Sequence, residues 1–230
     1  MSTPVLDHGY VSLVETWGSD ESIVEAARMS TGKGFQGWDK DEKFLKFLYD
    51  NKHSTPFEMA GAIFEIKAPI FIFREWHRHR TQSYNEMSAR YVPLPDENYV
   101  PSVGRIVASV MNAQLTKNKQ EGSDKKVEIF MEREAIAIQK CIKENYRLSE
   151  SGYQGMLAEG LPKELARLVL PVGRYSKMRA GANLRNWLAF LTLRQAPNAQ
   201  WEIQQYANVV ADLLTEKFPK TMELFNNEKS

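Results

Sequence analysis

The spacing of apolar side chains predicts a series of helices along this chain. Ile23, Val24 and Ala27 recur at helical spacing after Ser19, whose hydroxyl is suited to cap a first turn. We therefore expect a first helix that runs to about Met29. The same periodicity predicts further helices over residues 39–51, 70–77, 127–149, 163–170, 183–193 and 199–218.

One of these helices is ambiguous, because residues 70–77 fit a strand as well by periodicity. A proline at its start and the basic pair Arg74 and Arg78, four residues apart, favour a helix. The helical stripes also predict the core. The residues expected inside are Phe44, Leu45, Phe47, Leu48, Trp76, Phe130, Ala137, Cys141, Ile142, Trp187 and Trp201.

Residues 62–67 have the alternation of a strand. Ala62, Phe64 and Ile66 would share its buried face, and Pro69 would end it. The stretches without periodicity are a loop over 93–101 and a polar, lysine-rich connector over 115–126.

The residues Thr55-Pro56-Phe57-Glu58 predict the start of a short helix. Thr55 is placed to cap it, Pro56 to occupy its first position, and Glu58 to reach back as in a capping box. Free N–H groups at a helix start attract anions, and His53 lies beside this one.

Composition describes an ordinary globular protein. The 230 residues are 43% hydrophobic with a formal net charge of +1, which indicates one domain over residues 1–230 and argues against a general nucleic-acid binder. A single cysteine excludes an internal disulfide and a thiolate metal cage. No apolar run suits a membrane span or a signal peptide, so we expect a soluble, cytoplasmic protein with no membrane partner.

The segment from Arg78 to Arg90 concentrates the chemistry of the chain. It reads RHRTQSYNEMSAR, and its arginines present planar forks of donors that match phosphate and carboxylate oxygens. The expected ligand is therefore anionic. If residues 85–91 are extended, Glu86, Ser88 and Arg90 would lie on one face and contact one ligand.

A second cationic tract lies between Glu164 and Glu202, where no carboxylate occurs. Scattered surface charge is the plain explanation. The alternative is that these residues pair with ligand phosphates or with acidic residues elsewhere in the fold. The tract contains Arg167, Arg174, Lys177, Arg179, Arg185 and Arg194.

The first cationic segment matches the pattern RHRxxSxNExSxR at every fixed position, which is the signature of flavin-dependent thymidylate synthases. The chain resembles this family over most of its length and in the same order. The other similar segments are AARMS around Ser30, HSTPFE from His53, KAPIF before the signature, ARLVLP at Arg167, NLRNWLAFLTLR from Asn183 and QWEIQQYA from Gln200.

The resemblance implies an α+β fold, with a central sheet flanked by helices, in a homotetramer. It implies reductive methylation of dUMP to dTMP in de novo dTMP biosynthesis, with methylenetetrahydrofolate as carbon donor, FAD as redox cofactor and NADPH as reductant. By similarity, Arg194 would lie against the uracil and activate it without a covalent bond. Cys141 lies mid-helix without a neighbouring base, so we expect no cysteine nucleophile.

Site residues follow from the same resemblance. The FAD site would comprise Ser30, His53, Thr55, Arg78, His79, Arg80, Thr81, Asn85, Glu86, Asn183, Arg185 and Ala189. The dUMP site would comprise Glu75, Arg78, Glu86, Met87, Ser88, Ala89, Arg90, Arg167 and the catalytic Arg194. Three departures stand out: Ala189 where relatives often have Asn or His, Glu75 where many have Gln, and the stretch 175–182.

Helix geometry constrains two of these residues. Arg185 and Arg194 are nine positions apart, about half a rotation at roughly 100° per residue. Either the helix ends before Arg194, or its opposite faces serve different sites and the active site is shared between subunits.

Two other functions are compatible with the same side chains. A non-catalytic nucleotide- or RNA-binding module would use the arginines, although the chain has no aromatic stacking motif of a known RNA module. A metal-dependent hydrolase would use His77 and His79, but flanking cations repel a metal ion, so we expect no metal.

Overall fold

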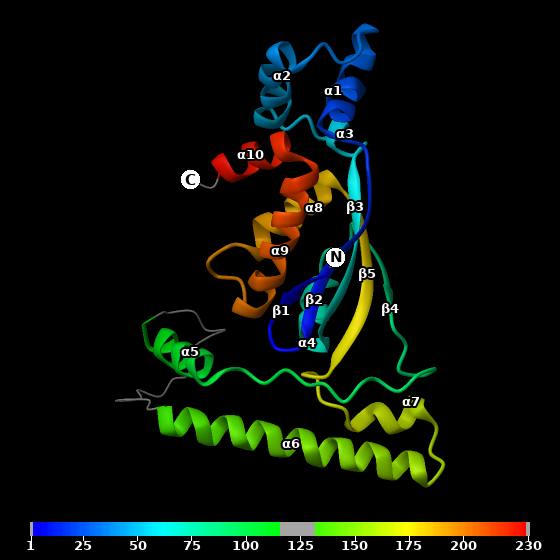
Figure 1. Cartoon of the computed structure of the whole chain (residues 1–230), viewed down its shortest axis with the longest axis vertical. Helices are drawn as coiled ribbons and strands as arrows, with labels where there is room; N and C mark the ends of the chain where they lie inside the picture. The colour runs from blue at the N-terminus through cyan, green and yellow to red at the C-terminus, as the bar shows by residue number, and fades with distance from the viewer. Residues whose placement is uncertain (1, 116–131, 229–230) are drawn as a thin grey trace. The chain divides into compact units, whose positions relative to one another are not determined.

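Two compact units make up the computed structural model, which describes residues 2–115 and 132–228. Unit 1 comprises Met1–Met87 and Tyr175–Ser230, and unit 2 comprises Ser88–Arg174. Figure 1 labels their helices and strands. The expectation of a single domain stays a prediction.

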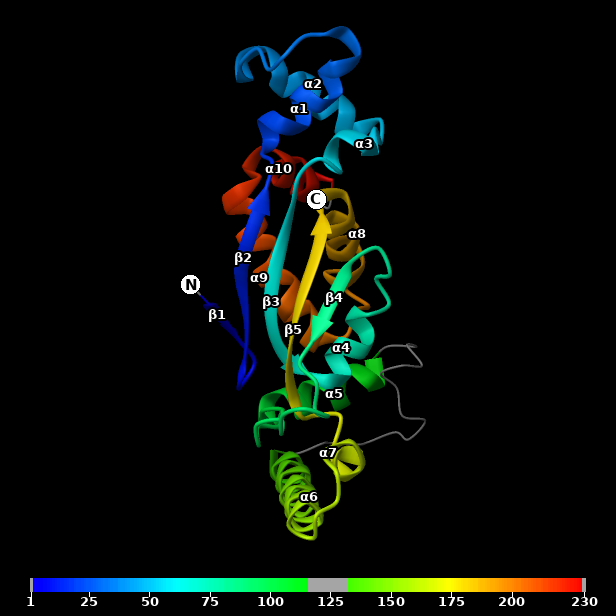
Figure 2. The same cartoon turned by 90° about the vertical axis from the view of Figure 1, so that its right-hand side faces the viewer.

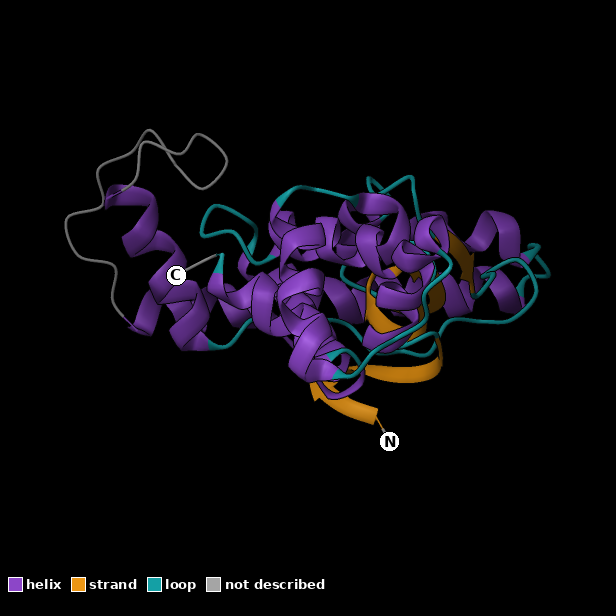
Figure 3. Cartoon of the chain, turned by 90° about the horizontal axis from the view of Figure 1, so that it is seen from above, coloured by secondary structure: helices purple, strands orange, loops and turns teal. Residues whose placement is uncertain are grey.

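Among the described residues, the strands that pair into a sheet all belong to unit 1 and are seen in orange in Figure 3. Its strands are β1 (Ser2–Val5), β2 (Gly9–Trp17), β3 (Gly61–Pro69), β4 (Ser83–Glu86) and β5 (Tyr175–Asn183). Its helices are α1 (Asp20–Arg28), the 3-10 turn η1 (Met29–Thr31), α2 (Trp38–Asp50), α3 (Ser54–Phe57), α4 (Ile70–Trp76), α8 (Leu184–Arg194), α9 (Trp201–Lys217) and α10 (Pro219–Asn227).

The sheet is antiparallel throughout, in the order β1-β2-β3-β5-β4. In its centre, β3 confirms the predicted strand, because Ala62, Phe64 and Ile66 are fully buried. Helices α8 and α9 lie against one face of the sheet (Figure 2). The α+β class expected from the resemblance is therefore confirmed.

Aromatic rings fill the space between the sheet and these helices. Trp76 of α4 stacks on Phe190 of α8 with ring centroids 4.5 Å apart, and Trp187 meets Phe64 of β3 at 4.9 Å. Both tryptophans are fully buried, as predicted. This packing fixes α4 and α8 relative to the sheet and hence the residues at their carboxyl ends.

Several helices agree with the periodicity of the sequence. Ser19 caps α1 by accepting a hydrogen bond from the Ser22 backbone N–H at 3.2 Å, and α4 confirms the helix predicted over residues 70–77. The helices predicted over 39–51, 183–193 and 199–218 are α2, α8 and α9, each with ends within two residues.

Two core predictions in unit 1 are wrong. Phe47 has 51% of its surface exposed, because Leu45 and Leu48 occupy the buried side of α2. Trp201 is 41% exposed, since it is the first residue of α9 and lies at the end of the helix.

The predicted capping of α3 is also wrong. The helix begins at Ser54, so the flanking residue is His53, and its side chain makes no capping hydrogen bond. Pro56 is the third residue of the helix, and Glu58 follows its end. A capping box needs Glu or Gln three residues after the capping position, and Pro56 occupies that position here.

The prediction that residues 85–91 are extended holds only for their beginning. Strand β4 ends at Glu86, and the chain turns from Ser88, whose carbonyl accepts from the backbone N–H of Tyr91 at 3.1 Å. The Ser88 hydroxyl also accepts from the Arg90 N–H at 3.3 Å, and such local bonds favour turns. Glu86, Ser88 and Arg90 therefore do not share a strand face.

Unit 2 is formed by α5 (Val103–Leu115), α6 (Glu132–Ala158), α7 (Lys163–Ala166) and the 3-10 turn η2 (Arg167–Val169). The last two confirm the helix predicted over 163–170, in two pieces, and 93–101 is a loop apart from one isolated bridge at Asn98. The connector over 116–126, and residues 127–131 with Phe130, lie outside the described residues.

Helix α6 buries little of its surface within the chain. Among its 27 residues, only Ala135 and Tyr153 are buried. Cys141 is exposed, so its assignment to the core was wrong, and Ala137 is exposed as well. An amphipathic pattern predicts a helix but does not say what covers its apolar side.

A buried arginine holds unit 2 together. The Arg174 guanidinium, fully buried, donates to the Pro95 carbonyl and to Asp96, both at 2.8 Å, and forms an ion pair with Glu150 of α6. Because one cation joins a loop to the long helix, its removal would leave a buried carboxylate unpaired. None of the described helices has the length and apolar character needed to cross a membrane.

Candidate functional site

Arg194, the last residue of α8, is held by the end of α4 and the segment that follows it. Its Nε donates to His79 Nε2 at 2.9 Å, and its Nη1 donates to Glu75 Oε2 at 2.9 Å. Its Nη2 donates to the Glu75 carbonyl at 2.8 Å, at the negative end of the α4 dipole. The Arg194 side chain is 17% exposed, so the protein does not enclose it completely.

The electrostatics of this cluster keep His79 neutral. Burial of the ring, and then the neighbouring Arg194 cation, lower the pKa of His79 to about 4. A neutral imidazole has one nitrogen that accepts, and this is the state that a hydrogen bond from Arg194 requires. The ring also packs edge-on against Phe190, at 4.9 Å between centroids.

Tyr84 of β4 fixes the backbone beside this cluster. Its hydroxyl lies 2.7 Å from the carbonyl of His79 and 3.0 Å from that of Trp76. Burial raises the pKa of Tyr84 to about 12, so the hydroxyl stays a donor. The segment between α4 and β4 is thereby held against the sheet.

The structure answers the geometric question about α8. The helix runs unbroken from Leu184 to Arg194, so Arg185 and Arg194 lie on opposite faces. Arg185 pairs with Glu58 at 2.7 Å, whereas Arg194 pairs with Glu75. Each arginine thus belongs to a separate part of unit 1.

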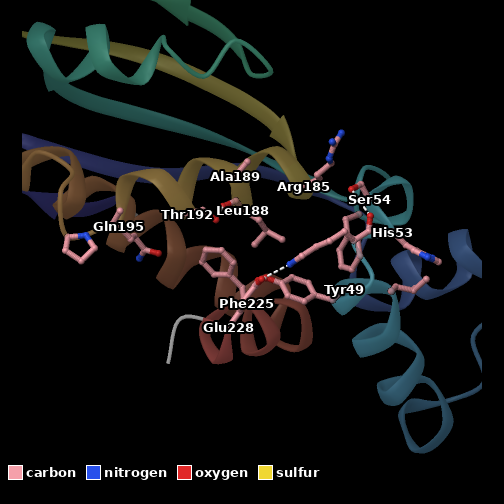
Figure 4. Close-up of a pocket in the computed structure, with 15 residues that line it drawn as sticks. Tyr49, His53, Ser54, Arg185, Leu188, Ala189, Thr192, Gln195, Phe225 and Glu228 are labelled. Atoms are coloured by element: carbon pink, nitrogen blue, oxygen red, sulfur yellow. Dashed lines mark hydrogen bonds and ion pairs between the residues drawn. The ribbon is translucent and has the colours of Figure 1, made fainter.

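A cavity of about 740 Å³ lies on the Arg185 side of α8 (Figure 4). Its walls come from α2, α3, α8 and α10 and are mainly apolar. The lining residues are Leu48, Tyr49, Lys52, His53, Ser54, Phe57, Arg185, Leu188, Ala189, Thr192, Gln195, Ala196, Pro197, Phe225 and Glu228. Three of them, His53, Arg185 and Ala189, were predicted from the sequence to be flavin-site residues.

One wall of the cavity was not predicted. Glu228 accepts a hydrogen bond from the Tyr49 hydroxyl at 2.7 Å and forms an ion pair with Lys52 at 2.6 Å. A dashed line that ends at Glu228 marks this part of the cavity in Figure 4. Lys52 and Glu228 are 176 positions apart in the sequence. No local pattern signals such a pair, so sequence reasoning could not find it.

The other predicted flavin residues lie on the surface of unit 1. Arg78, Arg80, Thr81, Asn85, Glu86, Ser30 and Thr55 are exposed and do not line the cavity. Within the described part of the chain, Arg78 and Arg80 form no ion pair. Asn183 caps α8 by accepting from the Asn186 N–H at 3.0 Å. Arginines that are exposed and unpaired are available to an anion.

The predicted dUMP residues are divided between the two units. Unit 1 carries Glu75, Arg78, Glu86, Met87 and Arg194. Unit 2 carries Ser88, Ala89, Arg90 and Arg167. Within unit 2, Arg90 lies 3.4 Å from the Glu164 carboxylate, and Arg167 Nε donates to the Glu164 carbonyl at 3.3 Å. Unit 2 therefore brings two of the predicted phosphate-binding arginines to one residue.

The carboxylate-free tract finds its partners elsewhere in the fold. Arg179 lies 3.5 Å from Glu65, while Arg174, Arg185 and Arg194 pair as described above. For these four arginines, the structure confirms the expectation that the tract pairs with acidic residues elsewhere in the fold. Among the described residues, no group of three or more His, Cys, Asp or Glu side chains could hold a metal ion.

Unit 1 is an α+β unit with exposed arginines that form no ion pair among the described residues, a firmly held arginine and an apolar cavity, features that suit anionic ligands with aromatic groups. Comparison with known proteins gives the family. Residues 12–220 match the family described as thymidylate synthase complementing protein. The chain belongs to this family, the flavin-dependent thymidylate synthases.

Named relatives agree along nearly the whole chain. The flavin-dependent thymidylate synthase of Thermus thermophilus is 38% identical over 98% of this chain and 78% of its own length. That of Thermosipho melanesiensis is 39% identical, over 98% and 93%. Among solved structures, a UMP/dUMP methylase from Streptomyces cacaoi bound with 5-Br dUMP superposes with a TM-score of 0.82 at 30% identity, covering 98% of this chain and 97% of its own.

Proposed function

We propose that this protein catalyses the reductive methylation of dUMP to dTMP, with methylenetetrahydrofolate as carbon donor and NADPH as reductant. The protein is an enzyme of the flavin-dependent thymidylate synthase family, and FAD is its cofactor. The observation that carries the proposal is Arg194, a mostly buried cation at the end of α8 that is held by Glu75 of α4 and by His79 of the signature segment.

The residues present fit a flavin dinucleotide. FAD combines a planar aromatic ring system with a pyrophosphate, so its site needs apolar walls and donors for anionic oxygens. The cavity offers apolar walls together with His53 and Arg185, and Arg78 and Arg80 are exposed without carboxylate partners among the residues that the structure describes. When bound, FAD supplies the hydride chemistry of the reaction. The residues that would hold it are Ser30, His53, Thr55, Arg78, Arg80, Thr81, Asn85, Glu86, Asn183, Arg185 and Ala189.

The protein's own contribution to the reacting ring would come from Arg194. A fixed cation beside the uracil stabilises negative charge that develops as C5 becomes nucleophilic, and its effect is large where water is excluded. No cysteine is needed in this account. Cys141 lies mid-helix on the exposed side of α6, and the Asn145 amide donates to its carbonyl at 2.8 Å.

The dUMP phosphate would be held by arginines and backbone N–H groups. Arg90 and Arg167 of unit 2 are exposed, and Arg90 has only a 3.4 Å contact with an equally exposed carboxylate. Such a surface pair is weak, so exchange for a phosphate costs little. We include Glu75, Arg78, Glu86, Met87, Ser88 and Ala89 in the same site.

The assembly and location belong to the proposal as well. Arg185 and Arg194 lie on opposite faces of α8, which supports active sites shared between the subunits of a homotetramer. The long helix α6 exposes Ile136, Ile138 and Leu148, and a partner subunit would cover such residues. We propose a cytoplasmic enzyme of de novo dTMP biosynthesis.

A direct experiment tests the activity. The purified protein is saturated with FAD, its visible spectrum is recorded, and NADPH, dUMP and methylenetetrahydrofolate are added. The expected results are flavin absorbance that survives gel filtration, bleaching on addition of NADPH, and dTMP in the product mixture. Omission of dUMP is the control for the product. A colourless protein, or a reduced flavin with no dTMP, would refute the proposal.

A further inference from the structure

Arg194 uses a defined subset of its hydrogen-bond donors within the chain. A guanidinium has five N–H groups. One on Nε, one on Nη1 and one on Nη2 are committed to His79 and Glu75. Within the described residues this leaves one N–H on each terminal nitrogen. Three contacts of 2.8 to 2.9 Å fix the plane of the group, so the two remaining donors have a fixed direction.

We infer that His79 and Glu75 are positioning residues, which act through Arg194 by fixing the direction of its two remaining N–H groups toward the substrate. This inference rests on the proposed function, since it assigns a role in the same reaction. It gives His79 a task on the substrate side, although sequence similarity had placed this residue among the flavin contacts.

The imidazole is suited to this task only when it is neutral. An imidazolium has donors on both nitrogens and would repel the guanidinium. The titratable groups that face His79 are Arg194 from α8, Glu75 from α4, whose carboxylate is bound to Arg194, and the Tyr84 hydroxyl from β4. The low pKa of His79 keeps the acceptor in place across the physiological range.

The carboxylate and the carbonyl of Glu75 hold the other side of the group. An ionised oxygen makes a stronger hydrogen bond to a guanidinium than an amide oxygen does. Glu75→Gln keeps an acceptor at the same position and removes only the charge. Substitution of Glu75 therefore tests the contribution of the charge, whereas substitution of His79 tests the contribution of the acceptor.

The decisive pair of variants is His79→Phe and His79→Gln. Phenylalanine preserves the ring contact with Phe190 but has no acceptor, whereas the glutamine amide oxygen can still accept from Arg194. We expect kcat to fall about 10- to 100-fold in His79→Phe, because a misdirected catalytic group costs up to that factor. We expect His79→Gln and Glu75→Gln to stay within about 5-fold of the unmodified enzyme, and FAD content to be unchanged in all three.

The matched control is His77→Phe, in the same segment. His77 contacts Tyr84 and Phe73 through its ring and makes no hydrogen bond to Arg194, so turnover should be unchanged. Equal turnover in His79→Phe and the unmodified enzyme would overturn the inference. An equal loss of turnover in His79→Phe and His79→Gln would also overturn the inference. The same holds if His79→Phe loses turnover because it no longer binds FAD.

A measurement without turnover separates this inference from the proposed function. The pKa of His79 is followed by NMR of nitrogen-labelled, FAD-free protein, with and without Arg194→Met. Removal of the cation should raise the pKa of His79, although burial will keep it below 6.5. If the unmodified protein makes no dTMP but this shift occurs, the activity is wrong and the contact stands. No shift would refute the contact itself.

Discussion

Arg194 differs from the other arginines of the carboxylate-free tract in what surrounds it. Arg179 and Arg185 each meet one partly exposed carboxylate, and solvent screens pairs of that kind. Arg194 instead meets a carboxylate, a backbone carbonyl and an imidazole, with little exposure. The same residue type therefore serves as a surface charge at one position and as a directed cation at another.

Replacement of Arg194 should separate binding from catalysis. Arg194→Ala removes the cation beside the substrate, so dTMP formation should fall on the order of a hundred- to a thousand-fold, while FAD absorbance stays. Steady-state assays and the visible spectrum of the same preparation give both values.

Cys141→Ala is the companion variant and should be nearly neutral for turnover. The thiol is exposed on α6, and its sulfur accepts a hydrogen bond from the Asn145 amide at 3.5 Å. Loss of dTMP formation in a folded Cys141→Ala protein would contradict the non-covalent account of uracil activation.

Acid should destabilise unit 1 through His79. Because the pKa is lowered from 6.5 to about 4 in the folded protein, the unfolded chain binds more protons between these values. Stability therefore falls as the pH drops through this window. The ring is partly exposed, so the loss should be on the order of 1 kcal/mol. Thermal unfolding between pH 7 and pH 4 measures this loss of stability. An equally steep loss in His79→Phe would contradict its assignment to His79.

At this scale the sequence identifies residue types but not their partners. The signature segment named His79 and its neighbours, yet the bond from Arg194 joins positions 115 apart. Lys52 and Glu228 meet across 176 positions at the cavity. Pairing at such separations depends on tertiary packing, which periodicity does not contain.

Among the elements, α10 was missing from the prediction, and its attachment explains why. Its first turn is held by Asp20 of α1, whose carboxylate accepts from the backbone N–H groups of Lys220 at 2.8 Å and Thr221 at 3.1 Å. The Thr221 hydroxyl donates to the same carboxylate at 2.6 Å. The carboxylate that caps α10 thus lies 201 positions away from Thr221 in the sequence. A pattern of neighbouring residues cannot reveal a cap at this separation.

Asp20→Ala should cost about 2–4 kcal/mol of unfolding free energy, because three donors at the start of α10, two of them buried, lose their acceptor. Urea unfolding followed by circular dichroism measures the change. Glu25→Ala is the control, since Glu25 is an exposed carboxylate of the same helix and should have little effect. Equal effects of the two variants would show that α10 does not depend on this contact.

Strands were predicted less well than helices for a physical reason. β3 is central, so its alternation is complete and was recognised. β5 alternates too, with Lys177 and Arg179 outside and Met178 and Ala180 inside, but its small residues weaken the contrast. β1 and β4 have four residues each at the sheet edges, too short for a period to emerge.

For the whole molecule, the division into two units follows from how each is stabilised. Unit 1 has a continuous apolar core between sheet and helices. Unit 2 relies on polar anchors, of which Arg174 is the most buried. Composition predicted a chain able to bury a core, but it could not tell that the described residues of unit 2 contribute few buried apolar side chains.

Arg174→Met should destabilise unit 2 by about 3 kcal/mol, because Glu150 would be left largely buried without its cation. Hydrogen exchange of α6 amides measures the loss. Arg147→Met is the control, since the pair of Arg147 with Glu144 on the same helix is exposed, and little change is expected. Unaltered α6 protection in Arg174→Met would refute the role of this anchor.

The two units also differ in their optical properties. All five tryptophans, including the fully buried Trp76 and Trp187, belong to unit 1, and unit 2 has none. Tryptophan emission therefore monitors the sheet-containing unit alone, while far-ultraviolet circular dichroism also records α6. If the two signals change at different denaturant concentrations, the units unfold separately. A single unlabelled sample can thus report on each half of the chain.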